Sequence, residues 1–142
     1  MPVREPPTTV LAHELRETVG RVVRRLRAEP GPSVGQLVVL GRLERDGPSS
    51  ISDLAAGERI RPQSMAQTVR DLEAADLVSR RPDPTDRRRA FIELTTAGLD
   101  LLQTTRAGRE TWLTEVLERE LDSGERRLLH DALLLLSRIA DA

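Results

Sequence analysis

Three consecutive arginines follow an aspartate in the segment DPTDRRRAFIELT, residues 83–95, although the 142-residue chain carries a formal net charge of only −1. Arginine presents five N–H donors in a rigid fork that matches phosphate oxygens, and it suits the narrow, negative minor groove of A·T-rich DNA. We therefore interpret Asp86, Arg87, Arg88 and Arg89 as a turn that binds an anion. A solvated charged turn is the alternative that any such run leaves open.

A second group of polar side chains lies on a predicted helix that begins at Pro62 and extends to about Ala75. Proline suits the first turn of a helix, and Met65, Val69 and Leu72 recur at the spacing of a buried helical stripe. The side chains off this stripe can donate or accept hydrogen bonds at base edges or phosphates, and glutamine can pair with adenine through two such bonds. They are Arg61, Gln63, Ser64, Gln67, Thr68 and Arg70. The alternative is an ordinary solvated helix face.

The distribution of charge along the chain supports a surface that meets an anion. Between Arg59 and Arg89 there are 8 arginines and 5 acidic residues, a balance of +3. The rest of the chain holds 14 arginines and 18 acidic residues, a balance of −4. A basic centre between acidic flanks indicates a module that binds a negatively charged partner through one face.

The elements around these residues predict a helix-turn-helix. Ser33 with Gln36 has the pattern of a capping box that starts one helix, and Ser50 with Asp53 starts a short second helix, for which Gly57 is the predicted end. A short helix, a tight connection and a second helix with a polar outer face are the pattern of a helix-turn-helix, whose second helix enters the major groove.

Two predicted strands, residues 77–81 and 89–94, follow the helix-turn-helix, with Arg87 and Arg88 in the loop between them and Arg89 at the start of the second strand. This arrangement is that of a wing. The predicted fold class is therefore mainly α (α+β), a winged helix-turn-helix with a two-stranded wing.

Long predicted helices flank the winged part: one from about Val10 to Ala28, one beyond Thr95 that carries apolar residues such as Leu99 and Leu117, and one that starts at the Asp122 and Glu125 capping pattern. The last of these is apolar on more than one face, which a second copy of the chain would cover. The predicted dimer-interface residues are Leu11, Leu15, Leu129, Leu133 and Leu136. We expect an N-terminal dimerisation helix in residues 1–32, a DNA-binding domain in 33–98 and C-terminal dimerisation helices in 99–142, within one compact chain.

Together these features resemble the MarR family of winged helix-turn-helix transcriptional regulators. The matching segments are QLVVLGRLERDGPSSISDLA, VRDLEAADLVSRR and above all DPTDRRRAFIELTTAG, which is similar to the family's wing signature of Asp, any residue, Arg and a strand that ends in Leu-Thr. Two positions depart from the family pattern. Asp76 stands where glycine is usual, and aspartate tolerates a left-handed turn better than most residues. Arg61 stands where a small capping residue is common, so we expect its side chain to extend toward a phosphate instead.

The resemblance implies a homodimer that binds double-stranded DNA at an inverted repeat and acts as a repressor. It also implies that Arg88 inserts into the minor groove, that Asp86 orients the wing, and that Arg87 and Arg89 reach phosphates or point away. Some MarR-like proteins bind small aromatic or anionic effectors, so such an effector is a further partner that the resemblance suggests. The competing interpretation is a winged-helix module for protein interaction, which acids on the recognition face or a wing without arginine would favour.

Other classes of function find little support in the sequence. It has no cysteine, and His13 and His130 lack the spacing of a metal site. There is no Gly-rich phosphate loop, no Ser-His-Asp arrangement that can be placed and no paired carboxylates in an evident apolar pocket, so we predict no catalytic residue, no metal and no cofactor. No apolar run approaches the ~18 to 20 residues of a membrane span, and the N-terminus has no signal-peptide core, which predicts a cytoplasmic protein without a membrane partner.

Overall fold

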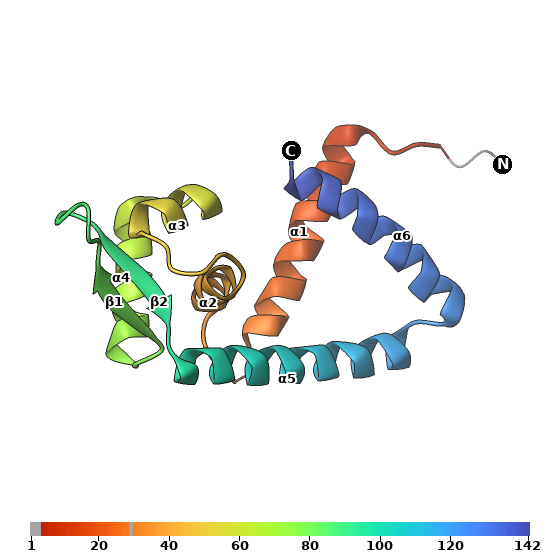
Figure 1. Ribbon diagram of the computed structural model, residues 1–142. Helices are drawn as coiled ribbons and strands as arrows, with labels where there is room; N and C mark the ends of the chain where they lie inside the picture. Colours follow the sequence, from red (N-terminus) through yellow and green to blue (C-terminus); the bar gives the residue numbers. More distant parts are fainter. Residues whose placement is uncertain (1–3, 29) are drawn as a thin grey trace. The chain divides into compact units, whose positions relative to one another are not determined.

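The computed structural model describes residues 4–28 and 30–142 (Figure 1). Within these residues the chain forms six helices and one two-stranded antiparallel sheet, which confirms the predicted fold class. The elements are α1 (Thr8–Arg27), α2 (Val34–Asp46), α3 (Ile51–Glu58), α4 (Pro62–Ala74), β1 (Val78–Pro82), β2 (Ala90–Leu94), α5 (Thr96–Glu120) and α6 (Ser123–Ala140). The chain divides into two compact units, residues 1–105 and 106–142. None of the described helices is long and apolar enough to cross a bilayer.

Reciprocal hydrogen bonds set where α2 and α6 begin. The Ser33 hydroxyl accepts a hydrogen bond from the Gln36 N–H, and the Gln36 side chain accepts one from the Ser33 N–H, both over 3.1 Å. Asp122 and Glu125 exchange the same pair of bonds over 2.9 Å before α6. Each box satisfies two backbone donors that a helix otherwise leaves without a partner, and both predictions are confirmed.

The short helix α3 differs from its prediction at both ends. At its start only half of the capping box forms: the Ser50 hydroxyl accepts from the Asp53 N–H over 3.1 Å, while the Asp53 carboxylate, one methylene shorter than glutamate, bonds elsewhere. At its end the helix passes through Gly57 and includes Glu58, so the prediction that Gly57 ends it is wrong. The left-handed residue that follows the helix is Arg59, with φ of 53°.

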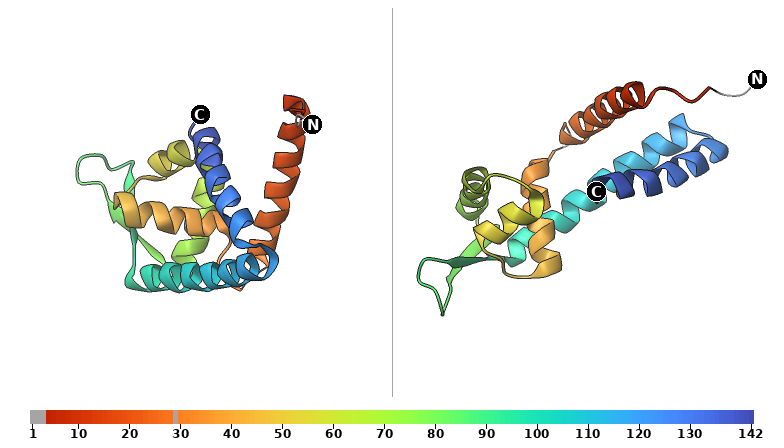
Figure 2. Two further views of the ribbon diagram at one scale, coloured as in Figure 1. Left: turned by 90° about the vertical axis from the view of Figure 1, so that its right-hand side faces the viewer. Right: turned by 90° about the horizontal axis from the view of Figure 1, so that it is seen from above.

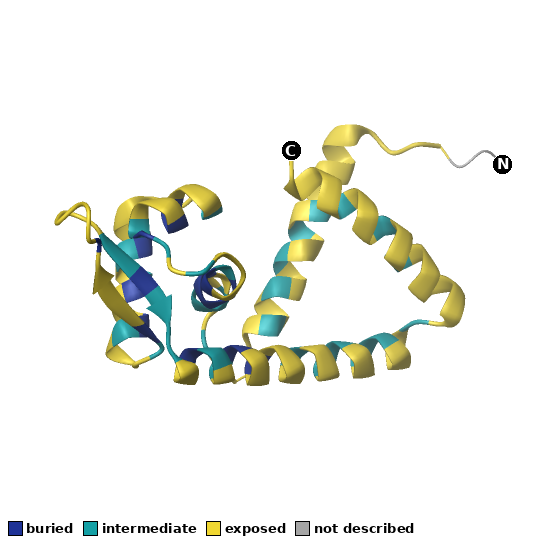
Figure 3. Ribbon diagram, in the orientation of Figure 1, coloured by how far each residue is buried: buried dark blue, intermediate teal, exposed yellow. Residues whose placement is uncertain are grey.

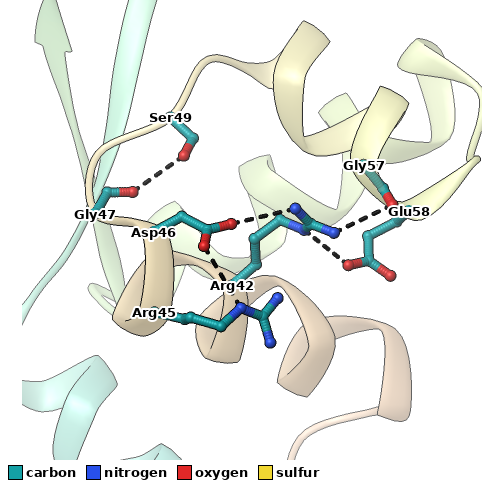
Figure 4. Close-up of polar contacts among 7 residues, drawn as sticks. All are labelled: Arg42, Arg45, Asp46, Gly47, Ser49, Gly57 and Glu58. Atoms are coloured by element: carbon teal, nitrogen blue, oxygen red, sulfur yellow. Dashed lines mark hydrogen bonds and ion pairs between the residues drawn. The ribbon is translucent and has the colours of Figure 1, made fainter. Parts of the chain in front are cut away.

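The side chain of Arg42 occupies the space beside Gly57 in α3. A Cβ built on Gly57 would lie 2.6 Å from the guanidinium carbon. Arg42 donates hydrogen bonds to Glu58 over 2.8 Å, to the Gly57 carbonyl over 3.1 Å and to Asp46 over 3.2 Å (Figure 4). The bond to Glu58 is the main reason that the pKa of Arg42 is raised, against the opposing effect of burial. This network joins α2 to the end of α3 and so fixes the turn that precedes α4.

The core of the first unit lies among α2, α3, α4, the sheet and the start of α5 (Figure 3). Its largest fully buried side chains are Leu40, Leu54, Met65, Leu72, Ile92, Leu102, Val39 and Val69. The α4 stripe of Met65, Val69 and Leu72 is buried as predicted. Burying each such side chain contributes about 1.5 to 3 kcal/mol, so the core fixes the rotation of α4 and leaves its polar face exposed.

The wing is an antiparallel hairpin in which Arg80 lies opposite Ile92. Both strands begin and end within one residue of their prediction. Ile92 also exchanges two backbone hydrogen bonds with Ser49, over 2.8 and 3.1 Å, which ties the sheet to the segment before α3. Asp76 adopts the expected left-handed conformation before β1, with φ of 59°. Figure 2 shows the loop between the strands projecting beyond α3 and α4.

The apolar stripes of α1 and α6 are largely uncovered in the single chain (Figure 3). Leu11 is 52% exposed and Leu133 is 50% exposed, whereas Leu15, Leu129 and Leu136 are partly buried. An exposed apolar stripe of this kind gains stability when a partner covers it. Membership of these five residues in a dimer interface remains a prediction.

Candidate nucleic-acid interface

Hydrogen bonds around Asp86 shape the loop of the wing. The Asp86 carboxylate accepts from the Arg88 N–H over 2.9 Å, and the Asp86 carbonyl accepts from the Arg89 N–H over 3.1 Å. The Arg89 carbonyl accepts from the Asp83 N–H over 3.2 Å and closes the loop. Aspartate supports such turns because its short carboxylate can bond the backbone two residues further on. Asp86 therefore sets the path of the backbone that carries Arg87 and Arg88.

A second aspartate, Asp83, stabilises the start of the same loop, and the sequence pattern had not singled it out. Its carboxylate is largely buried and accepts hydrogen bonds from the N–H and the hydroxyl of Thr85, both over 2.8 Å. The pKa of Asp83 is lowered, first by the Thr85 N–H and then by the Thr85 hydroxyl, while burial acts in the opposite direction. The order Asp-Pro-Thr is typical of a turn closed by an aspartate side chain, so it could have identified Asp83 from the sequence.

The three wing arginines differ in whether their guanidinium groups bond to other groups of the chain. Arg87 and Arg88 are exposed, and neither pairs with an acid among the residues that the structure describes. Arg89 instead donates to the Ser50 hydroxyl over 3.0 Å and to the Asp53 carboxylate over 3.2 Å. Two of the three guanidinium groups are therefore available to an external anion, and the third is bound within the chain.

An open hollow of about 240 Å³ lies between the start of α3 and the wing. Its polar lining consists of Ser50, Ser52, Arg80, Arg87, Arg88 and Arg89. The described part of the chain holds no group of three or more His, Cys, Asp or Glu side chains that could bind a metal ion. The hollow is smaller and more polar than the pockets that hold drug-sized ligands, and its cationic lining suits an anionic group.

The first turn of α4 combines exposed polar side chains with the absence of acids. Arg61 occupies the N-cap position without a side-chain capping bond, as predicted, and Gln63 and Ser64 are exposed. The Thr68 hydroxyl donates to the Ser64 carbonyl over 3.2 Å. The partial positive charge at a helix N-terminus and the lack of acids both favour the approach of a phosphate.

Gln67 lies between two charged neighbours on the same helix face. Its amide nitrogen donates to Asp71 over 2.8 Å, and its amide oxygen accepts from Arg70 over 2.8 Å. A carboxylate can only accept and a guanidinium can only donate, so the two neighbours fix the orientation of the amide. One N–H and one lone pair of Gln67 stay available for a base edge. The sequence pattern included Gln67 and Arg70 but missed Asp71, although the four-residue spacing was visible.

The eight arginines from Arg59 to Arg89 differ in whether they form an ion pair with an acid of the chain. Three of them pair with acids within the chain: Arg80 with Glu73, Arg81 with Glu93, and Arg89 with Asp53. Those without an acidic partner in the described residues are Arg59, Arg61, Arg70, Arg87 and Arg88. The uncompensated positive charge is therefore carried by α4, by the turn before it and by the tip of the wing.

Comparisons with known proteins show that the chain is similar to transcriptional regulators. The family model of the MarR family matches residues 33–90, which include α2, α3, α4, β1 and the wing loop. An HTH-type transcriptional regulator of Mycobacterium leprae is 33% identical over 134 residues, which cover 92% of this chain and 93% of that protein. The HTH-type transcriptional repressor NicR of Pseudomonas putida is 30% identical over 139 residues, or 95% of this chain and 85% of that protein. A solved transcriptional regulator of Pseudomonas aeruginosa has a TM-score of 0.75 and 37% identity, covering 96% of this chain and 99% of that one.

Proposed function

Because the chain belongs to the MarR family of transcriptional regulators, we propose that it acts as a homodimeric repressor that binds an inverted-repeat operator in double-stranded DNA. The observation that carries this proposal is the placement of the arginines without acidic partners on α4, before it and at the wing tip. Contacts to phosphates fix the register of a protein on DNA, and contacts to base edges supply sequence specificity. Repression is the activity named for the Pseudomonas putida relative.

The recognition helix of this proposal is α4, lying in the major groove. Its base-reading and backbone-contacting side chains are Gln63, Ser64, Gln67 and Thr68, with Arg61 and Arg70 toward phosphates. The first turn carries no acid, so no carboxylate there would repel the DNA backbone. The fixed amide of Gln67 supports the reading of adenine through one donor and one acceptor.

The wing lies over the adjacent minor groove, with Arg88 as the inserting side chain and Arg87 at a phosphate. Asp86 supports this role because it bonds the Arg88 N–H over 2.9 Å and thus holds the backbone of the tip. The hollow beside the wing has space for a phosphate group of the intervening backbone. The wing would then recognise the narrow minor groove at A·T-rich steps by its width, without base-specific contacts.

A two-fold dimer places two copies of α4 on one face of the duplex. In that geometry the half-sites lie about one helical turn, roughly 34 to 36 Å, apart. The exposed stripes of α1 and α6, which contain Leu11, Leu15, Leu129, Leu133 and Leu136, supply the apolar surface for pairing.

The direct test is fluorescence anisotropy with a duplex from the region upstream of the gene and a shuffled duplex, each over a range of salt. We expect the upstream duplex to bind ~10³-fold or more tightly, with both affinities falling as salt rises. Arg88→Ala should weaken specific binding and lower the salt slope by about one for each wing in contact with DNA. Arg45→Ala is the control, because Arg45 is exposed and pairs with Asp46 outside the interface.

If both duplexes bind equally and weakly, the upstream duplex does not contain the operator. The next step is then to select preferred sequences from random DNA. Failure of that selection to yield a preferred sequence would overturn the proposed function. Unchanged affinity of Arg88→Ala for a confirmed operator would overturn the assigned role of the wing.

A further inference from the structure

Arg89 is the last residue of the wing loop, directly before β2, and its side chain crosses to the start of α3. One terminal nitrogen of its guanidinium donates to the Ser50 hydroxyl over 3.0 Å and to the Asp53 carboxylate over 3.2 Å. The Arg89 backbone is held as well, because its N–H bonds the Asp86 carbonyl and its carbonyl accepts from the Asp83 N–H. Arg89 is therefore connected both to the loop of the wing and to a helix 36 to 39 residues earlier in the chain.

The two partners of Arg89 lie at the start of α3. Ser50 is only 4% exposed, and its hydroxyl also accepts the capping bond from the Asp53 N–H over 3.1 Å. Asp53 lies in the first turn of α3, where a negative charge is favourable. Arg89 thus bonds the hydroxyl that caps α3, and its charge is already compensated by Asp53.

The other connection between the wing and the α3 segment lies further from the tip. It is the pair of backbone hydrogen bonds between Ser49 and Ile92, at the middle of β2. Beyond β2 toward the tip, Arg89 is the residue whose side chain joins the described wing loop to α3. The hydrogen bonds of Asp86 act within the loop that carries Arg87 and Arg88, whereas the Arg89 side chain ties the end of that loop to α3.

We propose that Arg89 is a positioning residue for DNA binding, which locks the wing to α3 through Ser50 and Asp53 and thereby aims Arg87 and Arg88. This inference rests on the proposed function and replaces a direct phosphate contact as the role of Arg89. Asp53 becomes part of the DNA-binding apparatus, although a carboxylate near the DNA backbone would by itself oppose binding.

The two roles of Arg89 predict opposite effects of removing Asp53. If Arg89 only positions the wing, Asp53→Ala weakens operator binding roughly 3- to 10-fold despite the loss of a negative charge, as does Arg89→Ala. The double variant should be no weaker than Arg89→Ala alone, because both changes break one link. If Arg89 contacts a phosphate, Asp53→Ala strengthens binding, because it frees the guanidinium and removes a negative charge. Asp100→Asn removes an exposed carboxylate elsewhere in the first unit and controls for net charge.

Two further measurements separate positioning from a general loss of structure. The preference for an A·T-rich over a G·C-rich step under the wing should fall in Arg89→Ala as it does in Arg88→Ala, while the melting temperature stays at the wild-type value. Without DNA, the amide order parameters of Arg87 and Arg88 should fall toward the flexible range, below about 0.6, in both Arg89→Ala and Asp53→Ala.

The measurement without DNA also separates this inference from the proposed function. Wing amides that stay rigid in both variants overturn the inference whether or not the wild-type protein binds an operator. A flexible wing in both variants, combined with no preferred duplex for the wild type, supports the link and overturns the proposed function. A stronger-binding Asp53→Ala variant overturns positioning and assigns Arg89 to a phosphate.

Discussion

Gly98 packs directly against the backbone of Leu77, so that a Cβ built on Gly98 would overlap the Leu77 carbonyl oxygen and lie 2.9 Å from the Leu94 side chain. Thr95 reinforces this junction, because its N–H donates to the Leu77 carbonyl over 3.2 Å and its hydroxyl donates to the Asp76 carbonyl over 2.8 Å. The start of α5 is thereby fixed against the turn that leads into β1. A rotamer change cannot relieve a clash with backbone, so the position requires glycine.

Gly98→Ala should lower the free energy of unfolding by about 1 to 3 kcal/mol or more, because the added methyl group forces α5 away from the wing. Urea denaturation followed by circular dichroism measures this loss. Gly35→Ala is the matched control in the first turn of α2, where the nearest heavy atom to an added Cβ is the Ser33 hydroxyl at 4.0 Å. That control should be neutral or more stable by up to about 1 kcal/mol, and equal losses in both variants would contradict the close packing of Gly98.

Thr85→Val should raise the pKa of Asp83 toward its ordinary value of 3.8, although the Thr85 N–H keeps it below that value. The reason is the loss of the hydroxyl donor to the Asp83 carboxylate. Because the folded pKa lies below the unfolded one, ionised Asp83 stabilises the fold above its ordinary pKa, and this stabilisation is lost as the pH falls through the lowered value. Carboxyl-detected NMR titration measures the pKa, and a wild-type Asp83 that titrates at its ordinary value would refute the assigned hydrogen bonds.

Local features of the fold could be predicted from the sequence because they depend on residues three or four positions apart. The capping boxes of Ser33 and Asp122, the proline that starts α4 and the stripe of Met65, Val69 and Leu72 are all of this kind. The left-handed Asp76 could be anticipated for a similar reason, since it depends on its own side chain and a family position.

The contacts that escaped prediction join residues far apart in the chain. Gly57 was predicted to end α3, and the packing of Arg42 from α2 beside it could not be read from the local sequence. Asp53 was predicted as half of a capping box, but in the structure its carboxylate accepts a hydrogen bond from Arg89 of the wing. Charge counting placed the excess of arginines between Arg59 and Arg89, but which of them keep their charge available depends on the tertiary partners of each one.

Gln67→Ala should reduce discrimination at one base pair of each half-site by about 1 to 3 kcal/mol, because it removes a donor and an acceptor from the recognition face. Asp71→Asn should also reduce discrimination, since asparagine can donate as well as accept and no longer fixes the Gln67 amide. Binding to the shuffled duplex should be unchanged or tighter in Asp71→Asn, because a negative charge is lost. Competition between single-base operator variants measures both effects. Discrimination that survives in both proteins would remove Gln67 from the reading of bases.

Leu133→Asp should convert the predicted dimer to a monomer, because Leu133 is 50% exposed in the single chain and lies on the α6 stripe with Leu129 and Leu136. The carboxylate would enter the interface twice in a two-fold dimer, and a charge buried without a partner is strongly unfavourable. We expect the dissociation constant of the dimer to rise by about 100-fold or more. Operator affinity should fall, because one protomer contacts only one half-site. Sedimentation equilibrium measures the dissociation constant directly.

Leu134→Asp is the matched control for this interface. Leu134 is 62% exposed and lies about 100° further round α6 than Leu133, away from the stripe that Leu129 and Leu136 define. The variant should remain dimeric and should bind the operator normally, because a new charge on an uncovered face stays solvated. If Leu134→Asp dissociates while Leu133→Asp does not, the opposite face of α6 forms the contact, and if neither dissociates, the dimer pairs through another part of the chain.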